Sequence, residues 1–324
     1  MDMLDAITKQ NVQLAFEPEI EFSDRWQSYE KFVIAGMGGS HLAGDVLQCA
    51  NPLLDIILHS DYGLPALHPE HIDRRLFIAS SYSGNTEEVL DGFELALTRN
   101  MPVCAISMGG RLLDRAEQEK IPYIKMPDVG IQPRSALGFS IKALLKMMGR
   151  QNVSAELRAL SEKLVPSNLE HAGKKLAKHI ADRMPLIYAS SRNHAIAYNW
   201  KIKFNETGKI PAFMNIFPEL NHNEMTGFDV IKTTAPLSAH FYALILRDEE
   251  DDPRVQRRME ILERLYNDRA IPTQTIHVAG ASRFEKIFSS LYLADWAAYY
   301  TAEHYGADPS NVPMVEEFKK RMKG

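Results

Sequence analysis

LFIASSYSGNTEE, residues 76–88, is the stretch that decides the fold of the first half of the chain. Its first residues, Leu76–Ala79, form a short apolar run that is typical of a buried parallel strand. The serine-rich turn 80–84 follows, and behind it apolar residues recur at helical spacing over Thr86–Arg99. The stretch therefore predicts a strand, a tight turn and a helix start, which is the repeating unit of a parallel α/β sheet.

The turn places several hydrogen-bond donors at the start of that helix. Asn85 and Glu88, three residues apart, predict a capping box there. Serine hydroxyls and backbone N–H groups at a helix N-terminus favour a bound phosphate or carboxylate. The turn has no Lys and no GxxxxGK pattern, so it is not a nucleotide P-loop, and a monophosphate ester is the favoured ligand. On local chemistry alone, a serine-rich turn without a ligand remains the alternative.

Composition and charge exclude several classes of protein. With 324 residues, 45% of them hydrophobic and 24% charged, the chain has the composition of a globular protein and the length of two domains. A net charge of −5 gives no basis for binding nucleic acid or an anionic membrane. No apolar run approaches the roughly 20 residues of a membrane helix, and the N-terminus does not read as a signal peptide. Cys49 and Cys104, in apolar surroundings and without zinc-site spacing, predict reduced thiols and a cytoplasmic location.

Strand-like and helix-like segments alternate along the first 150 residues. The expected strands are Lys31–Ala35, Asp55–Leu58, Leu76–Ala79, Val103–Ile106 and Tyr123–Lys125. The expected helices are Leu42–Ala50, Thr86–Arg99, Leu112–Gln118 and Leu137–Met148. Residues 1–30 are expected to be helical and partly exposed, with Trp26 as an anchor. The alternation predicts a parallel sheet covered by helices on both faces.

The same alternation of strands and helices is expected in the second half of the chain, after a charged helical segment over residues 150–183 that connects the two domains. The expected elements there are Pro185–Ala189, Ala195–Phe204, Phe241–Leu246, Arg254–Tyr266, Thr275–Val278 and Glu285–Tyr305. Ser190–Asn193 is a second serine-containing turn, so the halves resemble a diverged duplication. The acidic run Arg247–Pro253 is expected to be an exposed loop.

A glycine-rich turn, GMGGS at residues 36–40, follows the first expected strand. The dinucleotide fingerprint G-x-G-x-x-G would need a glycine at position 41, where this chain has His41, so NAD is rejected as a ligand. Gly38 and Gly39 still allow a ligand to approach the backbone closely, and Ser40 supplies a donor.

The motifs together resemble a known family. GMGGS (36–40) with SYSGNTEE (81–88) resembles the sugar isomerase (SIS) family. Two further stretches, Gln132–Arg134 and KFNETGKIPAF…PELNHNE from Lys203 to Glu224, make the chain similar to the bifunctional phosphoglucose/phosphomannose isomerases of the phosphoglucose isomerase superfamily. The resemblance covers essentially the whole chain, because its last matching stretch is Val315–Lys320.

The resemblance implies a fold and a set of site residues. The fold is α/β with two SIS domains, each a parallel five-stranded sheet flanked by helices, expected at residues 1–150 and 151–324. The phosphate site would consist of Gly39, Ser40, Ser81, Ser83 and Thr86. The catalytic residues would be Glu206, His222, Lys319 and Arg134, with the neighbouring Lys320 as the alternative to Lys319. Family members are homodimers whose active site borrows the histidine from the partner subunit.

These residue types suit an aldose–ketose isomerisation, which would interconvert glucose 6-phosphate, and by the same resemblance mannose 6-phosphate, with fructose 6-phosphate. One base, Glu206, would carry a proton between C1 and C2, aided by burial that raises its pKa. His222 and Lys319 would open the sugar ring, and Arg134 would stabilise the cis-enediolate. No metal or organic cofactor is required by this chemistry. The first domain would bind the phosphate and the second would carry the catalytic Glu and His.

Other functions remain open at this point. Each catalytic candidate has a plainer interpretation: a solvated carboxylate, a loop histidine, a capping arginine or a lysine favoured by a helix dipole. A non-catalytic sugar-phosphate sensor would be expected to carry a helix-turn-helix domain, for which the first 30 residues are too few. A different SIS enzyme, acting on an amino sugar, is the other alternative.

Overall fold

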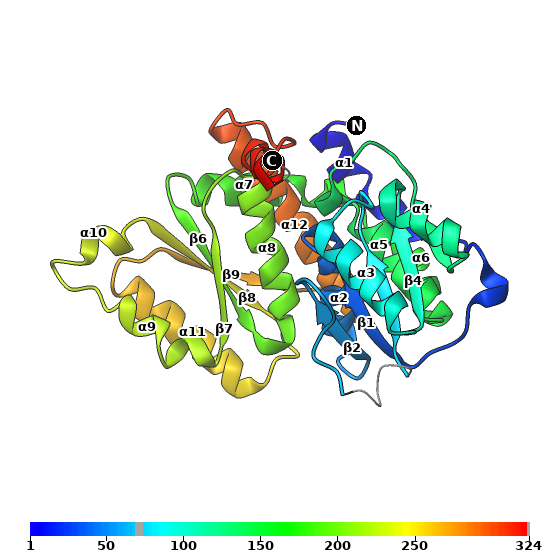
Figure 1. Cartoon of the computed structure of the whole chain (residues 1–324). Helices are drawn as coiled ribbons and strands as arrows, with labels where there is room; N and C mark the ends of the chain where they lie inside the picture. The colour runs from blue at the N-terminus through cyan, green and yellow to red at the C-terminus, as the bar shows by residue number, and fades with distance from the viewer. Residues whose placement is uncertain (69–73, 323–324) are drawn as a thin grey trace. The chain divides into compact units, whose positions relative to one another are not determined.

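The structure is a computed structural model of the whole chain, and it describes residues 1–68 and 74–322. These residues divide into unit 1, which consists of residue 1 and residues 8–165, and unit 2, which consists of residues 2–7 and 166–322. Figure 1 shows an α/β architecture in each unit, with one sheet and helices packed against it. The predicted domain boundary at residue 150 stays a prediction, and the last two residues of the predicted second domain lie outside the described residues.

The sheet of unit 1 has five parallel strands in the order β2-β1-β3-β4-β5, as predicted. They are β1 (Lys31–Ala35), β2 (Asp55–His59), β3 (Leu76–Ser80), β4 (Val103–Ser107) and β5 (Tyr123–Lys125). The chain continues from β1 toward β2 on one side and from β3 toward β4 on the other. The gap between the carboxyl ends of β1 and β3 is therefore a topological switch point, where open α/β sheets bind their ligands.

Helices cover both faces of this sheet. They are α2 (Gly39–Ala50), α3 (Glu87–Thr98), α4 (Gly110–Glu119), α5 (Leu137–Met147) and α6 (Gln151–Lys163). Helices α3 and α4 share a core with alternate strand residues such as Val33 and Phe77. The opposite face, which includes Ile34, packs against α2, because a Cβ added at Gly44 would lie 3.5 Å from the Ile34 side chain. The predicted layer order of helix, sheet and helix is confirmed.

The N-terminal segment differs from the prediction. Within residues 1–30, all of which the structure describes, the α-helix is α1 (Met3–Thr8), followed by the 3-10 turns η1 (Gln10–Ala15) and η2 (Ser23–Arg25). Glu21 instead forms an isolated bridge with Tyr123 of β5, which requires extended backbone. The indole Nε1 of Trp26 donates to the carbonyl of Met147 at 3.2 Å, so this side chain attaches its segment to α5.

The sheet of unit 2 is also parallel, with four described strands in the order β7-β6-β8-β9. They are β6 (Met184–Ser190), β7 (Phe213–Phe217), β8 (Phe241–Arg247) and β9 (Thr273–His277). The expectation of five strands is wrong for the described residues of this unit. After β9 the chain enters α12 (Arg283–His304), whose buried residues recur at helical spacing, and no further strand follows up to residue 322.

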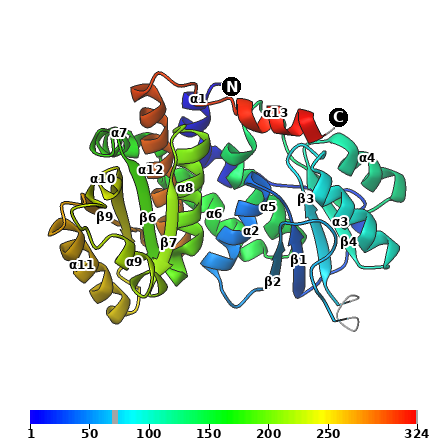
Figure 2. The same ribbon diagram turned by 60° about the vertical axis from the view of Figure 1, so that its left-hand side comes forward.

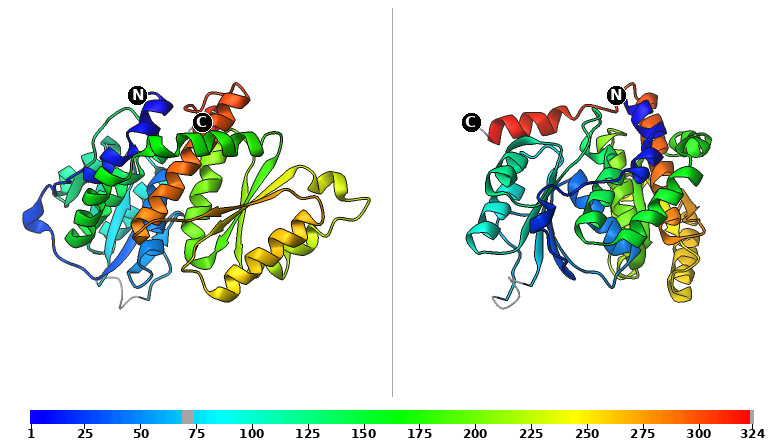
Figure 3. Two further views of the ribbon diagram at one scale, coloured as in Figure 1. Left: turned by 180° about the vertical axis from the view of Figure 1, so that it is seen from behind. Right: turned by 90° about the vertical axis from the view of Figure 1, so that its right-hand side faces the viewer.

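Helices flank the second sheet. The others in unit 2 are α7 (Glu170–His179), α8 (His194–Glu206), α9 (Glu224–Gly227), α10 (Ala235–Ser238), α11 (Pro253–Asn267) and α13 (Pro313–Met322), with the 3-10 turns η5 (Pro166–Leu169), η6 (Ser191–Asn193) and η7 (Glu219–Asn221). Helix α12, drawn in orange in Figure 3, packs against α7 and α8. Helix α1 completes this unit, because Met3 and Ile7 share a core with Trp296. No described helix is long and apolar enough to cross a membrane.

Strand β7 is an element that the sequence analysis does not predict. Its sequence FMNIF is short, has Asn215 at its centre and lies between two prolines, Pro211 and Pro218. It pairs only with β6 in the described sheet and leaves Phe213 49% exposed, so the burial that produces a recognisable strand pattern is weak.

Candidate functional site

Three loops of unit 1 meet at the switch point between β1 and β3. The Oγ atom of Ser40 accepts a hydrogen bond of 3.0 Å from the backbone N–H of Tyr82, which joins the first loop to the second. A Cβ atom added at Gly39 would lie 2.6 Å from the carbonyl of Pro133 and 2.8 Å from the nitrogen of Arg134, so the third loop touches the first. Only glycine fits at position 39, and this contact places the Arg134 backbone beside the serine loop.

The serine loop itself is held in one conformation by its own hydroxyls. The Oγ of Ser81 lies 2.8 Å from the Oγ1 of Thr86 and accepts a bond of 3.1 Å from the N–H of Gly84. Gly84 has φ +67°, and a Cβ there would lie 1.7 Å from the carbonyl oxygen of Gly109. The glycine is therefore required both by its conformation and by the close approach of the neighbouring loop.

The capping box predicted at Asn85 and Glu88 is wrong. Helix α3 begins at Glu87, with Thr86 as its N-cap residue. The Asn85 side chain donates to the carbonyl of Ser83 at 2.9 Å and accepts from the N–H of Arg111 at 3.3 Å. Asn85 thus fastens the serine loop to the start of α4 instead of capping α3.

The electrostatics of this place favour an anion. Helix α2 starts at Gly39 and α3 starts at Glu87, so two positive helix ends and their N–H groups meet the three loops. Ser81 is 1% exposed, Arg134 is 6% exposed, and Ser83 is exposed to solvent. Glu87 in the first turn of α3 opposes this charge but is itself exposed, where water screens it. Unit 1 thus brings together all the residues predicted to bind phosphate, with Arg134 beside them.

Glu206 lies in unit 2 as the last residue of α8, and it is half-buried. The helix ends there because the N–H groups of Thr207 and Gly208 both return to the carbonyl of Lys203, at 2.9 and 3.0 Å. The Nζ of Lys203 donates to the carboxylate of Asp295 on α12 at 2.6 Å, and both side chains are buried. The backbone that carries Glu206 is therefore fixed to α12.

His222 lies on the exposed turn between η7 and α9. The turn is anchored by Glu224, whose carboxylate accepts from the hydroxyl of Tyr188 at 2.6 Å and also accepts from the side-chain amide of Asn215. Burial, the neighbouring Tyr266 and the charge of Glu224 raise the pKa of Tyr188 well above its usual value. The phenol therefore stays a donor, and the imidazole is presented to solvent on a fixed turn.

Glu206 and His222 are not brought together within unit 2. Helix α8 runs back along the sheet, so Glu206 lies near the amino end of β7, whereas His222 follows its carboxyl end. The Cα atoms at the two ends of this five-residue strand are about 13 Å apart at roughly 3.3 Å per residue, so Glu206 and His222 extend from opposite ends of β7.

Lys319 lies on α13, the last helix, which Figure 2 shows in red near the C-terminus. Every residue of this helix is exposed. The Nζ of Lys319 pairs with the carboxylate of Glu316 one turn earlier at 2.9 Å, and the two side chains are 60% and 56% exposed. Lys320 beside it is exposed as well, so the choice between the two lysines stays a prediction.

The switch point of unit 2, between β6 and β8, is filled by side chains of the chain itself. The Oγ of Ser190 donates to the carboxylate of Asp251 at 2.5 Å, and the Nζ of Lys286 donates to that of Asp248 at 2.7 Å. Asp248 is fully buried and Asp251 is 4% exposed. The expectation that the acidic run 247–253 is an exposed loop is therefore wrong for Asp248 and Asp251, which are buried, and right for residues 249, 250, 252 and 253, which are exposed.

The two buried carboxylates titrate in opposite directions. Burial alone would raise the pKa of Asp248, but the hydrogen bond and charge of Lys286 outweigh burial and hold it below its usual value. Burial raises the pKa of Asp251 despite its bond from Ser190. The place in unit 2 that corresponds to the serine loop is thus occupied by ion pairs of the chain itself, in which Asp248 contacts Lys286, Arg283 and Arg192.

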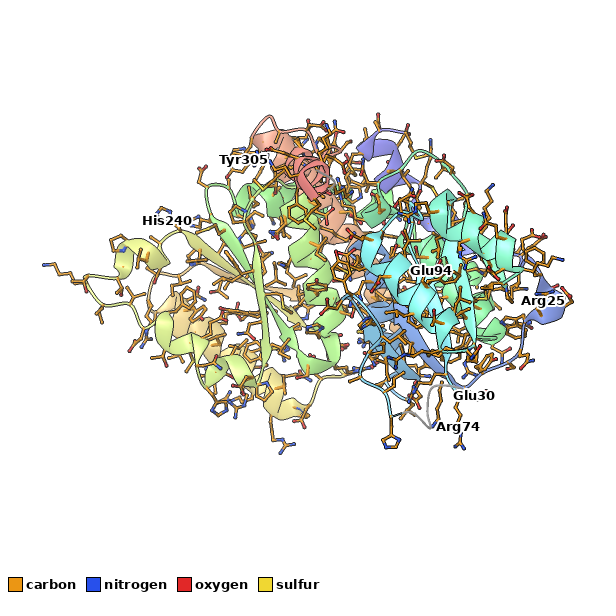
Figure 4. The ribbon with its side chains drawn as sticks, in the orientation of Figure 1. Arg25, Glu30, Arg74, Glu94, His240 and Tyr305 are labelled. Atoms are coloured by element: carbon orange, nitrogen blue, oxygen red, sulfur yellow. The ribbon has the colours of Figure 1, made fainter. Side chains whose placement is uncertain are left out.

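A hollow of about 370 Å³ lies at the other edge of the second sheet, beside the amino ends of β6 and β8. His240 and Tyr305, both labelled in Figure 4, border it. Its lining residues are Asp182, Arg183, Met184, Ile210, Pro211, His240 and Tyr305. None of the predicted site residues is among them.

Residues 1–68 and 74–322 contain no group of three or more His, Cys, Asp or Glu side chains that could hold a metal ion. Cys49 and Cys104 form no disulfide, and burial raises the pKa of the Cys104 thiol.

Two parallel α/β units, with a serine-lined loop and two helix N-termini at the switch point of the first, define a protein of the SIS fold class. A family model described as the bacterial phospho-glucose isomerase C-terminal SIS domain matches residues 169–322. The chain is 33% identical over 337 residues to the bifunctional phosphoglucose/phosphomannose isomerase of Caldicellulosiruptor bescii, covering 97% of this chain and 96% of the relative. It is 32% identical over 302 residues to that of Aquifex aeolicus, covering 91% of each.

The chain therefore belongs to the bifunctional phosphoglucose/phosphomannose isomerase family, which confirms the resemblance found in the sequence. Among solved structures, the glucosamine-6-phosphate deaminase of Thermotoga maritima matches with a TM-score of 0.69 at 15% identity, over 96% of this chain and 97% of that one. At that identity the likeness concerns the SIS fold alone.

Sequence reasoning missed residues that support the predicted ones. Glu224 stands at the end of the motif PELNHNE, and Lys209 stands within KFNETGK, so both were visible in the family pattern. Tyr188, the partner of Glu224, lies on β6 and reads as an ordinary core residue. Its role depends on a contact 36 residues away in sequence.

Proposed function

We propose that this chain interconverts glucose 6-phosphate with fructose 6-phosphate, and mannose 6-phosphate with fructose 6-phosphate. Membership of the bifunctional isomerase family carries this proposal. The geometry of unit 1 supports it, because hydroxyls, N–H groups and two helix ends converge where a phosphate ester would bind. The substrate phosphate would contact Ser40, Ser81, Ser83 and Thr86.

Catalysis would follow from the proposed roles of four side chains. Glu206 takes the proton from one of C1 and C2 and returns it to the other, so one carboxylate serves both half-reactions. Arg134 stabilises the negative oxygens of the cis-enediolate intermediate. His222 and Lys319 exchange protons at the ring oxygen and O1 when the pyranose ring opens. The reaction moves protons within one sugar and has no net oxidation, so these side chains can supply every acid and base that it needs.

The active protein would be a homodimer with shared sites. The position of Glu206 and His222 at opposite ends of β7 supports this arrangement, because a second copy of the chain could supply the histidine to the site of the glutamate. The exposed, anchored turn of His222 is suited to reach a second copy. In this proposal residues 1–150 bind the phosphate and supply Arg134, residues 151–324 supply Glu206, His222 and Lys319, and the enzyme works in the cytoplasm.

A coupled assay tests the function directly. The purified chain is supplied in turn with glucose 6-phosphate, mannose 6-phosphate and glucosamine 6-phosphate, and formation of fructose 6-phosphate is followed. Turnover of the first two, with no product from the amino sugar, is expected. Turnover confined to glucosamine 6-phosphate would assign the chain to an amino-sugar enzyme. Binding of the sugar phosphates without turnover of any would make it a sensor.

A further inference from the structure

Lys209 joins two segments that are far apart in the sequence. It follows α8 by three residues and has a left-handed backbone with φ +59°, which is uncommon for a residue with a side chain. Its Nζ donates to the backbone carbonyl of Glu206 and to the backbone carbonyl of Asn311, 102 residues later. One ammonium group therefore bonds both the residue proposed as the base and the segment that leads into α13.

The first of these segments, the turn at the end of α8, is rigidly held. A Cβ added at Gly208 would lie 2.8 Å from the carbonyl oxygen of Phe204 and 3.4 Å from that of Ala298 on α12. The buried pair between Lys203 and Asp295 fixes the same turn to the same helix. The ammonium of Lys209 also sits at the negative end of α8, where a cation is stabilising.

The second segment, which leads into α13, is shaped by a small turn at residues 308–311. The carboxylate of Asp308 accepts from the N–H of Ser310 at 2.8 Å and from the side-chain amide of Asn311. The bond from Ser310 and, to a smaller degree, the charge of Lys209 lower the pKa of Asp308. Helix α13 begins directly after this turn, at Pro313, and none of its side chains is buried. The helix that carries Lys319 is therefore held at its start rather than by packing along its length.

We infer that Lys209 is a positioning residue for the isomerisation. Its ammonium holds the backbone of Glu206 and the start of α13 together, so the carboxylate that moves the proton and the ammonium of Lys319 keep a constant relationship. This inference rests on the roles proposed above for Glu206 and Lys319. It adds that Glu206 and Lys319 are carried by two segments that the Lys209 ammonium connects through their backbone carbonyls.

Substitution of Lys209 tests the inference. Lys209→Met removes the ammonium and keeps the length of the side chain. The kcat should fall by about tenfold, because a small displacement of a catalytic group slows the chemical step by at least this much. The KM for fructose 6-phosphate should change by less than about twofold, since the phosphate loops lie in unit 1. Lys209→Arg, which can still donate to both carbonyls, should recover most of kcat.

Lys120→Met is the matched control. Lys120 also ends a helix, α4, with a left-handed φ of +54°, but it lies in unit 1. Its substitution should leave kcat unchanged, and an equal loss in both variants would overturn the inference. If Lys209→Met does not fold, Lys209→Gln, which keeps a shorter donor, replaces it and should show an intermediate loss.

A double-mutant cycle separates this inference from the proposed function. If Lys209 acts through α13, Lys209→Met should lower kcat much less in a Lys319→Met background than in the wild type. Independent, multiplying losses would overturn the connection to α13. If Lys319→Met alone keeps the wild-type kcat, the role proposed for Lys319 is wrong, and with it this connection.

Hydrogen exchange gives a readout that needs no activity. Backbone amides of residues 308–318 should exchange faster in Lys209→Met than in the wild type, while those of α2 and α3 stay unchanged. Unchanged exchange over 308–318 would overturn the inference even if the chain proves to be an isomerase.

Discussion

Glu206 and His222 lie at opposite ends of strand β7, although only 15 residues separate them along the chain. The crossover from α8 into a parallel strand requires this, because the helix must return to the amino edge of the sheet before β7 begins. Two residues that the family motif places almost side by side in sequence are therefore kept apart by the fold. The proposed shared site would bring the two residues to one sugar from two copies of the chain.

Mixing two inactive variants should restore activity. Glu206→Gln and His222→Ala should each be nearly inactive alone with ring-closed substrate, but subunit exchange would create mixed dimers with one intact site. About a quarter of wild-type activity is expected, because half of randomly formed dimers are mixed and each has one intact site of two. The rate is measured after the mixed proteins have exchanged subunits. A mixture in which one partner carries both substitutions serves as the control and should stay inactive, and absence of recovery in the test mixture would contradict a shared site.

Removal of a loop hydroxyl should weaken phosphate recognition. Thr86→Val leaves the Ser81 hydroxyl without its 2.8 Å partner and removes one donor from the anion site. The KM for sugar phosphates should rise by about tenfold, the size expected for one lost hydrogen bond to a charged group, with binding of free glucose unchanged. Thr98→Val, at the other end of α3, should have no effect on KM. An equal change for phosphorylated and free sugar would mean that Thr86 does not contact the phosphate.

The sequence predicts the architecture well where burial produces a clear period. The strands β1, β3 and β4 are continuous apolar runs, and each is found within one residue of its predicted bounds. Strand β7 escaped prediction because it is a short edge strand with a polar centre and weak burial. The N-terminal segment was misjudged because Glu21 takes part in a bridge with Tyr123, a partner about 100 residues away.

In the candidate site, too, features set by local sequence were predicted and features set by distant contacts were not. Local patterns were enough to find the serine loop, Gly39 and Gly84, whose constraints come from nearby backbone. The supporting contacts of Lys209 and Tyr188 join distant segments, so no local pattern could indicate them. The burial of Asp248 within the acidic run 247–253 depends on pairing with Lys286 and Arg283 of α12, which are distant in sequence, so the run's local charge pattern does not indicate it.

The buried ion pair of unit 2 should contribute to stability. Lys286→Met leaves the fully buried Asp248 with one partner fewer and should lower the free energy of unfolding by about 3 kcal/mol. Arg254→Met, which breaks an exposed pair with Asp252, should cost less than about 1 kcal/mol. Chemical denaturation at neutral pH measures both values, and equal losses would contradict a role for burial.

The difference in unfolding free energy between the wild type and Lys286→Met should depend on pH in one direction. The pKa of Asp248 is lower in the folded state than its usual 3.8, so its stabilisation is complete above that value and is lost as pH falls through the folded pKa. The gap in stability between the wild type and Lys286→Met should therefore be constant near neutrality and shrink in acid. A gap that widened as pH fell from 4 to 2 would contradict this account.

The anchor beneath His222 can be tested without changing the turn. Tyr188→Phe removes the hydroxyl that donates to Glu224 at 2.6 Å and should destabilise unit 2 by about 1–3 kcal/mol. Loss of this anchor should displace the His222 imidazole, which is proposed to open the sugar ring. Turnover of ring-closed substrate should therefore fall more than turnover of the open-chain form. Tyr242→Phe, on β8 of the same sheet, is the control and should preserve the ratio of the two rates. A uniform fall for both substrate forms would mean that Tyr188 serves stability alone.

The sharpest prediction concerns the proton that moves between C1 and C2. Glu206→Gln keeps the size of the side chain and removes its basic oxygen, so isomerisation should fall by the factor of about 10² to 10⁴ that a general base contributes. Incorporation of solvent deuterium at C2 should fall with it, because the same carboxylate collects the proton and exchanges it with water. Both measurements should hold when open-chain substrate is supplied, whereas His222→Ala should be partly rescued under that condition. Glu303→Gln, a carboxylate in the last turn of α12 that is exposed to solvent, provides the matched control and should turn over normally. Near-normal turnover by Glu206→Gln, or continued entry of deuterium at C2, would transfer the role of base to another residue.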